Sequence, residues 1–190
     1  SVYLSDEKIG DAVDNNIIEE GKGTAKEHHF DEAFGYFGVP IDFPTNTDGI
    51  RFWGKYCNSR DNLVNTNDIM HEFIKGRAAI SNKDQDAQDK AVSNIKLQWE
   101  KSAAATGIHY LNDGIAEFGD DANRCHVLTE AFAFIDALKY NADATITAST
   151  INDVLATLGD NFWTVTKSDI EAARDLLATA AGLESVKGDL

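Results

Sequence analysis

A regular series of helix start and stop signals constrains the fold of this chain more than any other feature. Thr24 and Glu27 have the spacing of a capping box, in which two side chains satisfy backbone N–H groups at a helix N-terminus. A helix is therefore expected from about Ala25 to Phe37, ending before Gly38. No stretch alternates polar and apolar residues, and no hairpin turn joins two β-branched runs. The sequence predicts an all-α fold, a helical bundle with no significant sheet.

Similar signals predict the remaining helices. Ser5, followed by two acidic residues, predicts a helix that runs to about Glu20, and Pro40 and Pro44 bracket a short extended linker. The other expected helix starts are Asp48, Asn67, Asp84, Asp120 or Asp121, Thr147 or Ser149, and Thr166. The expected ends are about Ala105 for the helix that starts at Asp84, and about Tyr140, Gly159 and Gly182 for the last three.

The charge of the chain excludes one class of partner. Its 190 residues include 32 Asp and Glu against 17 Lys and Arg, which gives a net charge of -15. Such a surface repels phosphate backbones and anionic membranes, so we expect no nucleic-acid partner. No run approaches the roughly 18 apolar residues of a membrane-spanning helix, so we do not expect the chain to cross a membrane. A hydrophobic content of 43% with 2 Pro is typical of a folded chain, here a single all-helical domain over residues 1–190.

The two cysteines, Cys57 and Cys125, leave two alternatives for a structural role. They are too few for a thiolate metal cluster and too far apart for a Cys-x-x-Cys redox motif. They form a single disulfide if the compartment is oxidising, or they are two free and mostly buried thiols.

An internal echo is the most informative feature for function. The segments that begin at His28 and His126 share the pattern His-x-x-x-Glu-Ala-Phe, followed by a small residue and two apolar ones. This echo predicts an internal duplication, with related halves at about residues 5–65 and 84–182. Two such halves, packed with equivalent helices close together, would bring both His/Glu pairs around one centre.

The spacing of these residues suggests a metal site. Glu32 shares a helix face with His28 and His29, and His126 shares one with Glu130. Imidazole and carboxylate side chains on facing helices are typical ligands of iron, manganese or zinc. The first interpretation is thus that these five residues bind a divalent metal or iron. The second is that they are hydrogen-bonded core residues that brace the two halves.

The aromatic residues are expected mainly to pack. Aromatic side chains of the two motif copies are predicted to form the contact between the two halves, with Trp53, Trp99 and Trp163 buried against them. These side chains are Phe34, Tyr36, Phe37, Phe132 and Phe134. An exposed aromatic groove that binds a peptide, a sugar or haem is the alternative.

Known catalytic patterns are missing from the sequence. A zinc peptidase of the His-Glu-x-x-His type needs a second histidine after His71-Glu72, and the chain continues with other residues there. No Gly-x-Ser-x-Gly elbow occurs either. We therefore favour a protein that is not an enzyme, and a peptidase is the third choice.

Two segments, Asp14–Thr24 and Glu27–Gly38, resemble the signature region of a bacterial domain family of unknown function. The signature is His-x-x-Asp-Glu-Ala-Phe-Gly-Tyr, and the family consists of surface or periplasmic lipoproteins in the neighbourhood of the imelysins. The run from His29 to Glu32 also resembles the His-x-x-Glu core of the imelysin motif, although Glu27 stands where that motif has glycine.

The resemblance implies a fold of two helical bundles, a periplasmic or cell-surface location and a link to iron acquisition. It also implies that the chain is a C-terminal fragment whose signal and anchor lie outside this sequence. The start at Ser1 and the single methionine, Met70, lead to the same expectation.

Two hypotheses of function follow. In the first, the protein is a non-catalytic, extracytoplasmic binding component of a metal or metal-complex uptake system of the iron type. Its partners would be the metal or a small ligand, another membrane-anchored uptake protein, and a second copy of the chain in a homodimer. In the second, it is a structural or partner-binding helical module in which the His/Glu pairs are buried struts.

Overall fold

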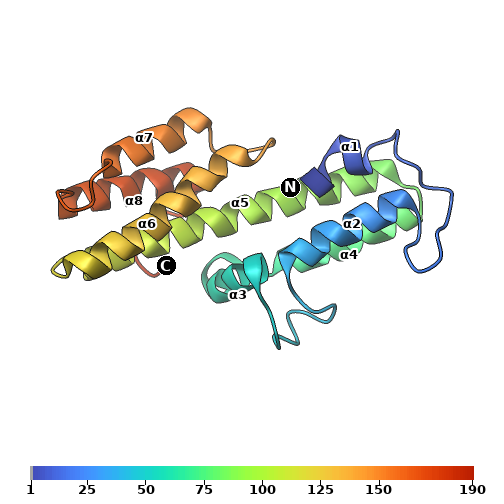
Figure 1. Cartoon of the computed structure of the whole chain (residues 1–190), viewed down its shortest axis with the longest axis horizontal. Helices are drawn as coiled ribbons and strands as arrows, with labels where there is room; N and C mark the ends of the chain where they lie inside the picture. The colour runs from blue at the N-terminus through green and yellow to red at the C-terminus, as the bar shows by residue number, and fades with distance from the viewer. Residues whose placement is uncertain (1) are drawn as a thin grey trace. The chain divides into compact units, whose positions relative to one another are not determined.

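The computed structural model describes residues 2–190, and its elements are helices (Figure 1). Within the described residues no strand forms, and the nearest approach to one is an isolated bridge between Glu19 and Gly23. The all-α prediction is confirmed. In chain order the elements are the 3₁₀ helix η1 (Val2–Leu4), α1 (Asp6–Ile9), α2 (Ala25–Phe37), α3 (Phe52–Val64), α4 (Asp68–Ser81), α5 (Gln85–Ala116), α6 (Asp121–Ala137), the 3₁₀ helix η2 (Leu138–Tyr140), α7 (Ala148–Leu158) and α8 (Lys167–Ala181).

The chain forms two compact units, each of which is described by itself. The first unit contains the described residues up to Ser59 together with Thr66–Trp99, and the second contains Arg60–Asn65 and Glu100–Leu190. The division between the units falls inside α3, after Ser59, and inside α5, after Trp99, and Thr66 returns the chain to the first unit.

Aromatic side chains dominate the core of the first unit. Phe37 packs against Phe73 and Trp99 at ring-centroid distances of 5.5 and 5.9 Å. Phe30 contacts Phe73 edge-on at 5.8 Å, so one cluster joins α2, α4 and the first part of α5. α2 lies beside α4 (Figure 1). Their close approach depends on Gly76, because a Cβ atom there would lie 2.6 Å from the Phe30 ring.

The core of the second unit is aliphatic. Gly107 of α5 lets Ile135 of α6 and Leu177 of α8 approach closely, since a Cβ there would lie 3.0 and 3.2 Å from them. α7 packs along α8 (Figure 1). The buried Glu100 accepts hydrogen bonds from Asn141 and Thr145, which fixes the loop before α7 to α5.

Most of the predicted helix ends are confirmed. The Thr24–Glu27 capping box forms as expected, and α2 ends before Gly38, which adopts a left-handed conformation. A second capping box, between Thr166 and Asp169, starts α8. Asp120 and Thr147 cap α6 and α7 with their side chains, Asn67 precedes α4, and Gly159 and Gly182 follow α7 and α8.

The first helix is much shorter than predicted. It ends at Ile9 rather than near Glu20, because Gly10 is extended and the chain turns away there. The Asp14 carboxylate then accepts the N–H groups of Asn16 and Ile17, which holds a turn in place of the helix.

Two other helix boundaries also differ from the prediction. α3 begins at Phe52 rather than Asp48, because the Asp48 N–H is bonded to the Asn46 side chain in a turn. α5 continues to Ala116 rather than ending near Ala105. Gly107, which follows the alanine run, lies inside the helix, where its lack of a side chain lets Ile135 and Leu177 pack closely.

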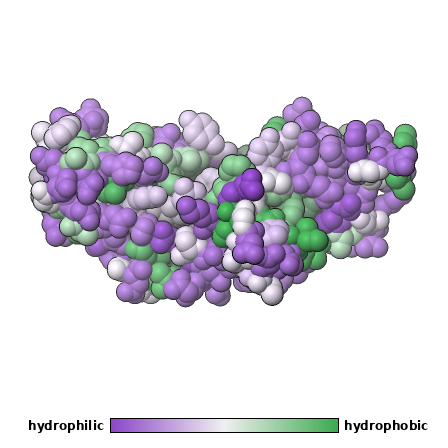
Figure 2. Space-filling view, turned by 60° about the horizontal axis from the view of Figure 1, so that its bottom comes forward, coloured by the Kyte–Doolittle hydropathy of each residue, from purple (hydrophilic) through white to green (hydrophobic). Residues whose placement is uncertain are grey.

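Hydrophilic residues cover most of the face in Figure 2. Trp53 and Trp99 pack against the first core, as expected. Trp163 is 66% exposed, so its predicted burial is wrong. Over residues 2–190, no helix combines the length and the apolar character needed to cross a membrane.

Candidate functional site

Three of the five predicted metal ligands lie together on α2. His28 Nε2 is 3.9 Å from Glu32 Oε1, and the two side chains are 43% and 35% exposed. This pair is accessible to solvent, and a dissolved ion could reach it.

His29 points its ring toward the N-terminal segment. Its Nδ1 lies 2.7 Å from the carbonyl oxygen of Lys8. Because a carbonyl oxygen only accepts hydrogen bonds, Nδ1 carries the proton and Nε2 keeps its lone pair. Metal-binding histidines commonly have this arrangement, and it also suits a structural histidine.

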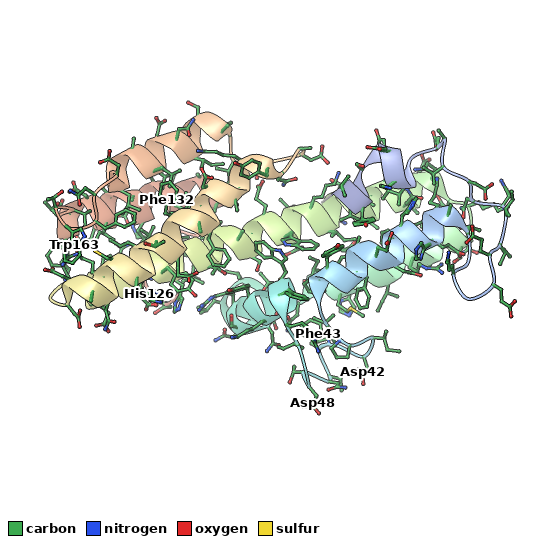
Figure 3. All side chains as sticks on the ribbon, viewed as in Figure 1. Asp42, Phe43, Asp48, His126, Phe132 and Trp163 are labelled. Carbon is green, nitrogen blue, oxygen red and sulfur yellow. The ribbon has the colours of Figure 1, made fainter. Side chains whose placement is uncertain are left out.

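The other two predicted ligands belong to the second unit. His126 is exposed on α6 (Figure 3). Glu130 of the same helix is half-buried. No ion pair of the described residues joins them.

Histidine, cysteine and carboxylate side chains alone do not complete a metal site. Among residues 2–190, no three of them come together in a group that could hold an ion. Any site built on His28 and Glu32 therefore needs donors of another kind.

Two tyrosines lie beside this pair. Tyr3 of η1 stacks on Tyr36 of α2, with ring centroids 5.6 Å apart and an interplanar angle of 22°. The negative charge of Glu32 raises the pKa of Tyr3 above its ordinary value, and burial, Tyr36 and hydrogen bonds to both residues act in the same direction. The two hydroxyls, the carboxylate and the His28 imidazole thus form one group, named here the Tyr–Glu–His cluster.

The same tyrosines line an aromatic hollow of about 390 Å³. Phe52 in its wall is 62% exposed and has a φ of 51°, an unusual backbone conformation for a bulky residue. An exposed and strained aromatic residue of this kind suits a ligand surface better than a core. The lining residues are Val2, Tyr3, Tyr36, Phe52, Trp53 and Trp99.

The sequence analysis did not identify Tyr3 and Tyr36 as possible ligands. Tyr36 follows Glu32 by one helical turn, as Glu32 follows His28, so helical spacing alone could have placed it on the same face. Tyr3 gave no such signal, because it reaches the cluster from a separate segment.

Two further His–carboxylate pairs were also missed. His71 lies 3.7 Å from Asp68 on α4, and both side chains are more than 60% exposed. His109 lies 3.3 Å from Asp113 on α5 in the second unit. These pairs provide internal comparisons for the His28–Glu32 pair.

No disulfide joins the two cysteines of the described residues. Cys57 is buried and Cys125 is half-buried, and they belong to different units.

The fold defines an all-α helical-bundle protein with a Tyr–Glu–His cluster beside an aromatic hollow. The chain belongs to the family described as "Domain of unknown function (DUF4856)", whose model matches residues 1–184. A family of unknown function was predicted, and this coarser part of the prediction is confirmed. No curated protein and no solved structure matches the chain significantly.

Proposed function

We propose that the protein is a non-catalytic binding component of an iron-type uptake system, and that it binds an iron(III) complex at the Tyr–Glu–His cluster. The observation that carries this proposal is that Tyr3 and Tyr36 belong both to the donor cluster and to the wall of the aromatic hollow.

The donor set suits iron(III) better than a soft divalent ion. Phenol and carboxylate oxygens are hard ligands, and imidazole also suits iron. The 3.9 Å between His28 and Glu32 is compatible with two neighbouring ligands of one ion, since bonds of about 2 Å place such donors roughly 3 to 4 Å apart.

The proton on Tyr3 adds a selectivity argument. Since Glu32 raises the pKa of Tyr3, an ion that takes this hydroxyl as a ligand must displace a more firmly held proton, which favours iron(III) over a weakly polarising divalent ion. A weakly acidic divalent ion would be left with His28 and Glu32 alone.

The aromatic hollow favours a metal complex over a bare ion. Its volume of about 390 Å³ lies within the range of small-ligand pockets, and rings such as Trp53 and Phe52 offer flat apolar faces. The organic part of the complex would contact these rings while the iron contacts the tyrosines.

The resemblance to imelysins supplies the biological setting of the proposal. His29 and Glu32 of the His-x-x-Glu core both lie on α2, a bundle helix. A periplasmic or cell-surface location and a membrane-anchored uptake partner are part of this proposal. His126 and Glu130 would add ligands only if the two units bring them to the same ion.

Spectroscopic titration tests the proposal. The purified chain is titrated with iron(III) nitrilotriacetate and separately with haem, and binding is followed in the visible range. We expect a tyrosinate-to-iron charge-transfer band with the first probe or a shifted haem spectrum with the second. Tyr3→Phe and Tyr36→Phe should remove the signal, and Glu32→Gln should weaken binding at least about tenfold.

Matched controls separate this site from general surface binding. Tyr140→Phe removes a tyrosine that is 79% exposed in the second unit, and Asp68→Asn breaks the comparable His71 pair. Both variants should behave like the wild type. A wild type that binds neither probe, or tyrosine variants that bind normally, would contradict the proposal.

A second candidate function rests on an apolar groove of about 410 Å³ between α2 and α4. Ile41 and Ile74 line it and are 84% and 54% exposed, which favours a partner-binding module or a homodimer. Sedimentation of the wild type, of Ile74→Lys and of the control Ile18→Lys tests self-association. A homodimer through this groove predicts that only Ile74→Lys is monomeric.

A further inference from the structure

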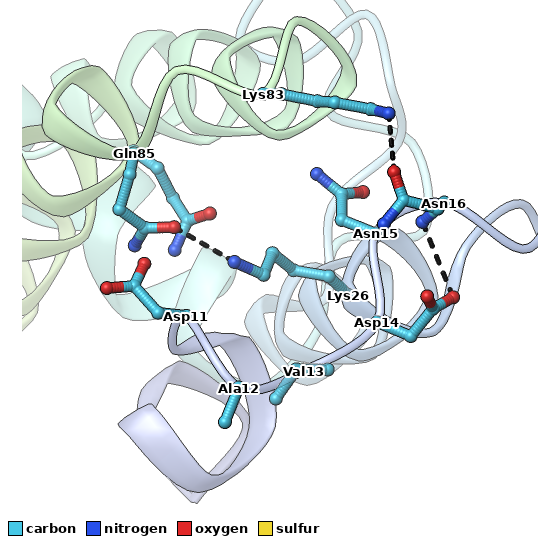
Figure 4. A pocket seen from close by; sticks show the side chains of 10 residues that line it. Asp11, Ala12, Val13, Asp14, Asn15, Asn16, Lys26, Lys83 and Gln85 are labelled. Atoms are coloured by element: carbon cyan, nitrogen blue, oxygen red, sulfur yellow. Dashed lines mark hydrogen bonds between the residues drawn. The ribbon is translucent and has the colours of Figure 1, made fainter.

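A polar pocket of about 450 Å³ lies where α2 and α5 begin (Figure 4). It shares no lining residue with the aromatic hollow. Its walls come from the loop after α1, the first turns of α2 and α5, and Lys83, which lies two residues before α5. The lining residues are Asp11, Ala12, Val13, Asp14, Asn15, Asn16, Lys26, Lys83, Gln85 and Gln88.

Lys26 is the unusual member of this pocket. It is only 4% exposed, and its Nζ donates a 2.9 Å hydrogen bond to Gln85 Oε1, a neutral acceptor. None of the ion pairs within residues 2–190 includes Lys26. A buried ammonium that donates to a neutral amide is costly unless water or an anion also contacts it from the open side, which here is the pocket.

Helix α6 carries a buried cation, Arg124, at the position equivalent to Lys26. Arg124 stands two residues before His126, as Lys26 stands two residues before His28, and it is also 4% exposed. Its guanidinium donates to the carbonyls of Phe162 and Phe118 at 3.2 and 2.7 Å and pairs with Asp121 at 2.7 Å. Protein atoms therefore satisfy Arg124, whereas Lys26 faces a cavity.

The frame around Lys26 is ordered by its own hydrogen bonds. Gln88 donates to the carbonyl of Ile9 at 2.7 Å, and Asn15 donates to the carbonyl of Ile80 at 2.8 Å. Lys83 donates to the side chain of Asn16 at 2.7 Å. These hydrogen bonds hold the lining residues in place, so little ordering would be required on binding.

From this geometry we infer that the pocket binds the carboxylate of a small organic acid, with Lys26 as its ion-pair partner. The side-chain amides of Gln85 and Gln88 already donate to Asp89 and to the Ile9 carbonyl, so their Oε1 atoms would accept a hydrogen bond from a hydroxyl group next to the carboxylate.

The charges of the pocket favour a monocarboxylate over a phosphate. Asp11 and Asp14 line the same cavity, and both are exposed. Lys26 and Lys83 balance these two carboxylates, so the formal charges of the lining residues cancel, and Lys83 already donates to Asn16. A doubly charged phosphate would be repelled more strongly than a singly charged acid.

Calorimetric titration of the whole chain tests the inference. The probes are sodium lactate, sodium acetate and inorganic phosphate at matched ionic strength, with sodium chloride as the blank. We expect lactate to bind more tightly than acetate and phosphate. Lys26→Met should weaken lactate binding about tenfold or more, because a charged hydrogen-bond partner is lost. The control Lys90→Met, at an exposed position of α5, should bind like the wild type.

A substitution at an exposed residue separates an effect on binding from an effect on folding. Asp11→Asn removes a carboxylate from the pocket without disturbing the core, and it should tighten lactate binding by about twofold. In parallel, lactate should raise the melting temperature of the wild type and of Lys90→Met but not of Lys26→Met. No carboxylate binding by the wild type, unchanged binding in Lys26→Met, or tighter binding of phosphate would each overturn the inference.

Discussion

Lys26 of α2 and Arg124 of α6 occupy equivalent positions in the two copies of the motif, and each residue is only 4% exposed. The remaining buried positions of α2 and α6 also coincide when His28 is aligned with His126. They are Phe30 and Leu128, Ala33 and Ala131, and Phe37 and Ile135. The echo is therefore a repeated packing pattern with a cation at the same place, and the two copies differ in how that cation is satisfied.

The first prediction concerns Arg124. Replacing it by methionine leaves the carbonyls of Phe118 and Phe162 without their donor inside the second unit. We expect Arg124→Met to lower the free energy of unfolding by about 2 to 4 kcal/mol, measured by urea denaturation. Lys26→Met should be close to neutral, since it removes a buried charge whose only protein partner is an amide. Equal losses in both variants would contradict this difference.

The second prediction concerns acid stability and Glu27. The backbone N–H of Thr24, the Ser81 hydroxyl and Arg77 hold the pKa of Glu27 at about 2, below its ordinary value of 4.5. Because the folded-state pKa is lowered, the stabilisation is complete above the ordinary pKa. It is lost as the pH falls from about 5 through 2. Glu27→Gln should remove up to about 3 kcal/mol at pH 7 and flatten the fall in unfolding free energy over that range.

The control for Glu27 is an exposed glutamate of α8, Glu171. Glu171→Gln should leave the acid-unfolding profile unchanged. If Glu27→Gln unfolds at the same pH as the wild type, other carboxyl groups determine the pH at which acid unfolds the protein.

Most helix ends could be predicted because their causes are local. The Thr24–Glu27 box needs only four residues, and Gly38 ends the helix through its own backbone freedom. The first helix was predicted to be too long, because side-chain hydrogen bonds that compete with the helix decide where it ends. The Asp14 side chain binds two backbone N–H groups there, and periodicity does not reveal this.

The candidate site was predicted only in part, for a related reason. His28 and Glu32 were found because helical spacing places them on one face. Tyr3 joins them through the packing of η1 on α2, a contact between segments that no spacing rule connects. The polar pocket depends in the same way on the loop after α1 folding against α5.

The third prediction concerns Glu100, which is 5% exposed. Its carboxylate accepts the N–H and the hydroxyl of Thr145 and the side-chain amide of Asn141. Glu100→Ala should cost about 2 to 4 kcal/mol of unfolding free energy, because these donors lose their acceptor. Glu100→Gln should lose less, since an amide still accepts at one oxygen. The control Glu117→Ala, at an exposed position, should change the urea midpoint little. A similarly small change in Glu100→Ala would show that the loop before α7 does not depend on the Glu100 carboxylate.

The fourth prediction compares two glycines inside helices. A Cβ at Gly76 of α4 would lie 2.6 Å from Phe30 Cζ and 3.3 Å from Ala91 Cβ, whereas a Cβ at Gly35 of α2 would meet nothing within 4 Å. Gly76→Ala should therefore destabilise the protein by about 1 to 3 kcal/mol through overpacking. Gly35→Ala should stabilise it by about 0.5 to 1 kcal/mol, because alanine loses less backbone entropy in a helix. Thermal melts of the two variants should shift in opposite directions. A neutral Gly76→Ala would mean that the Phe30 ring can move away and that the close packing of α2 on α4 is not essential.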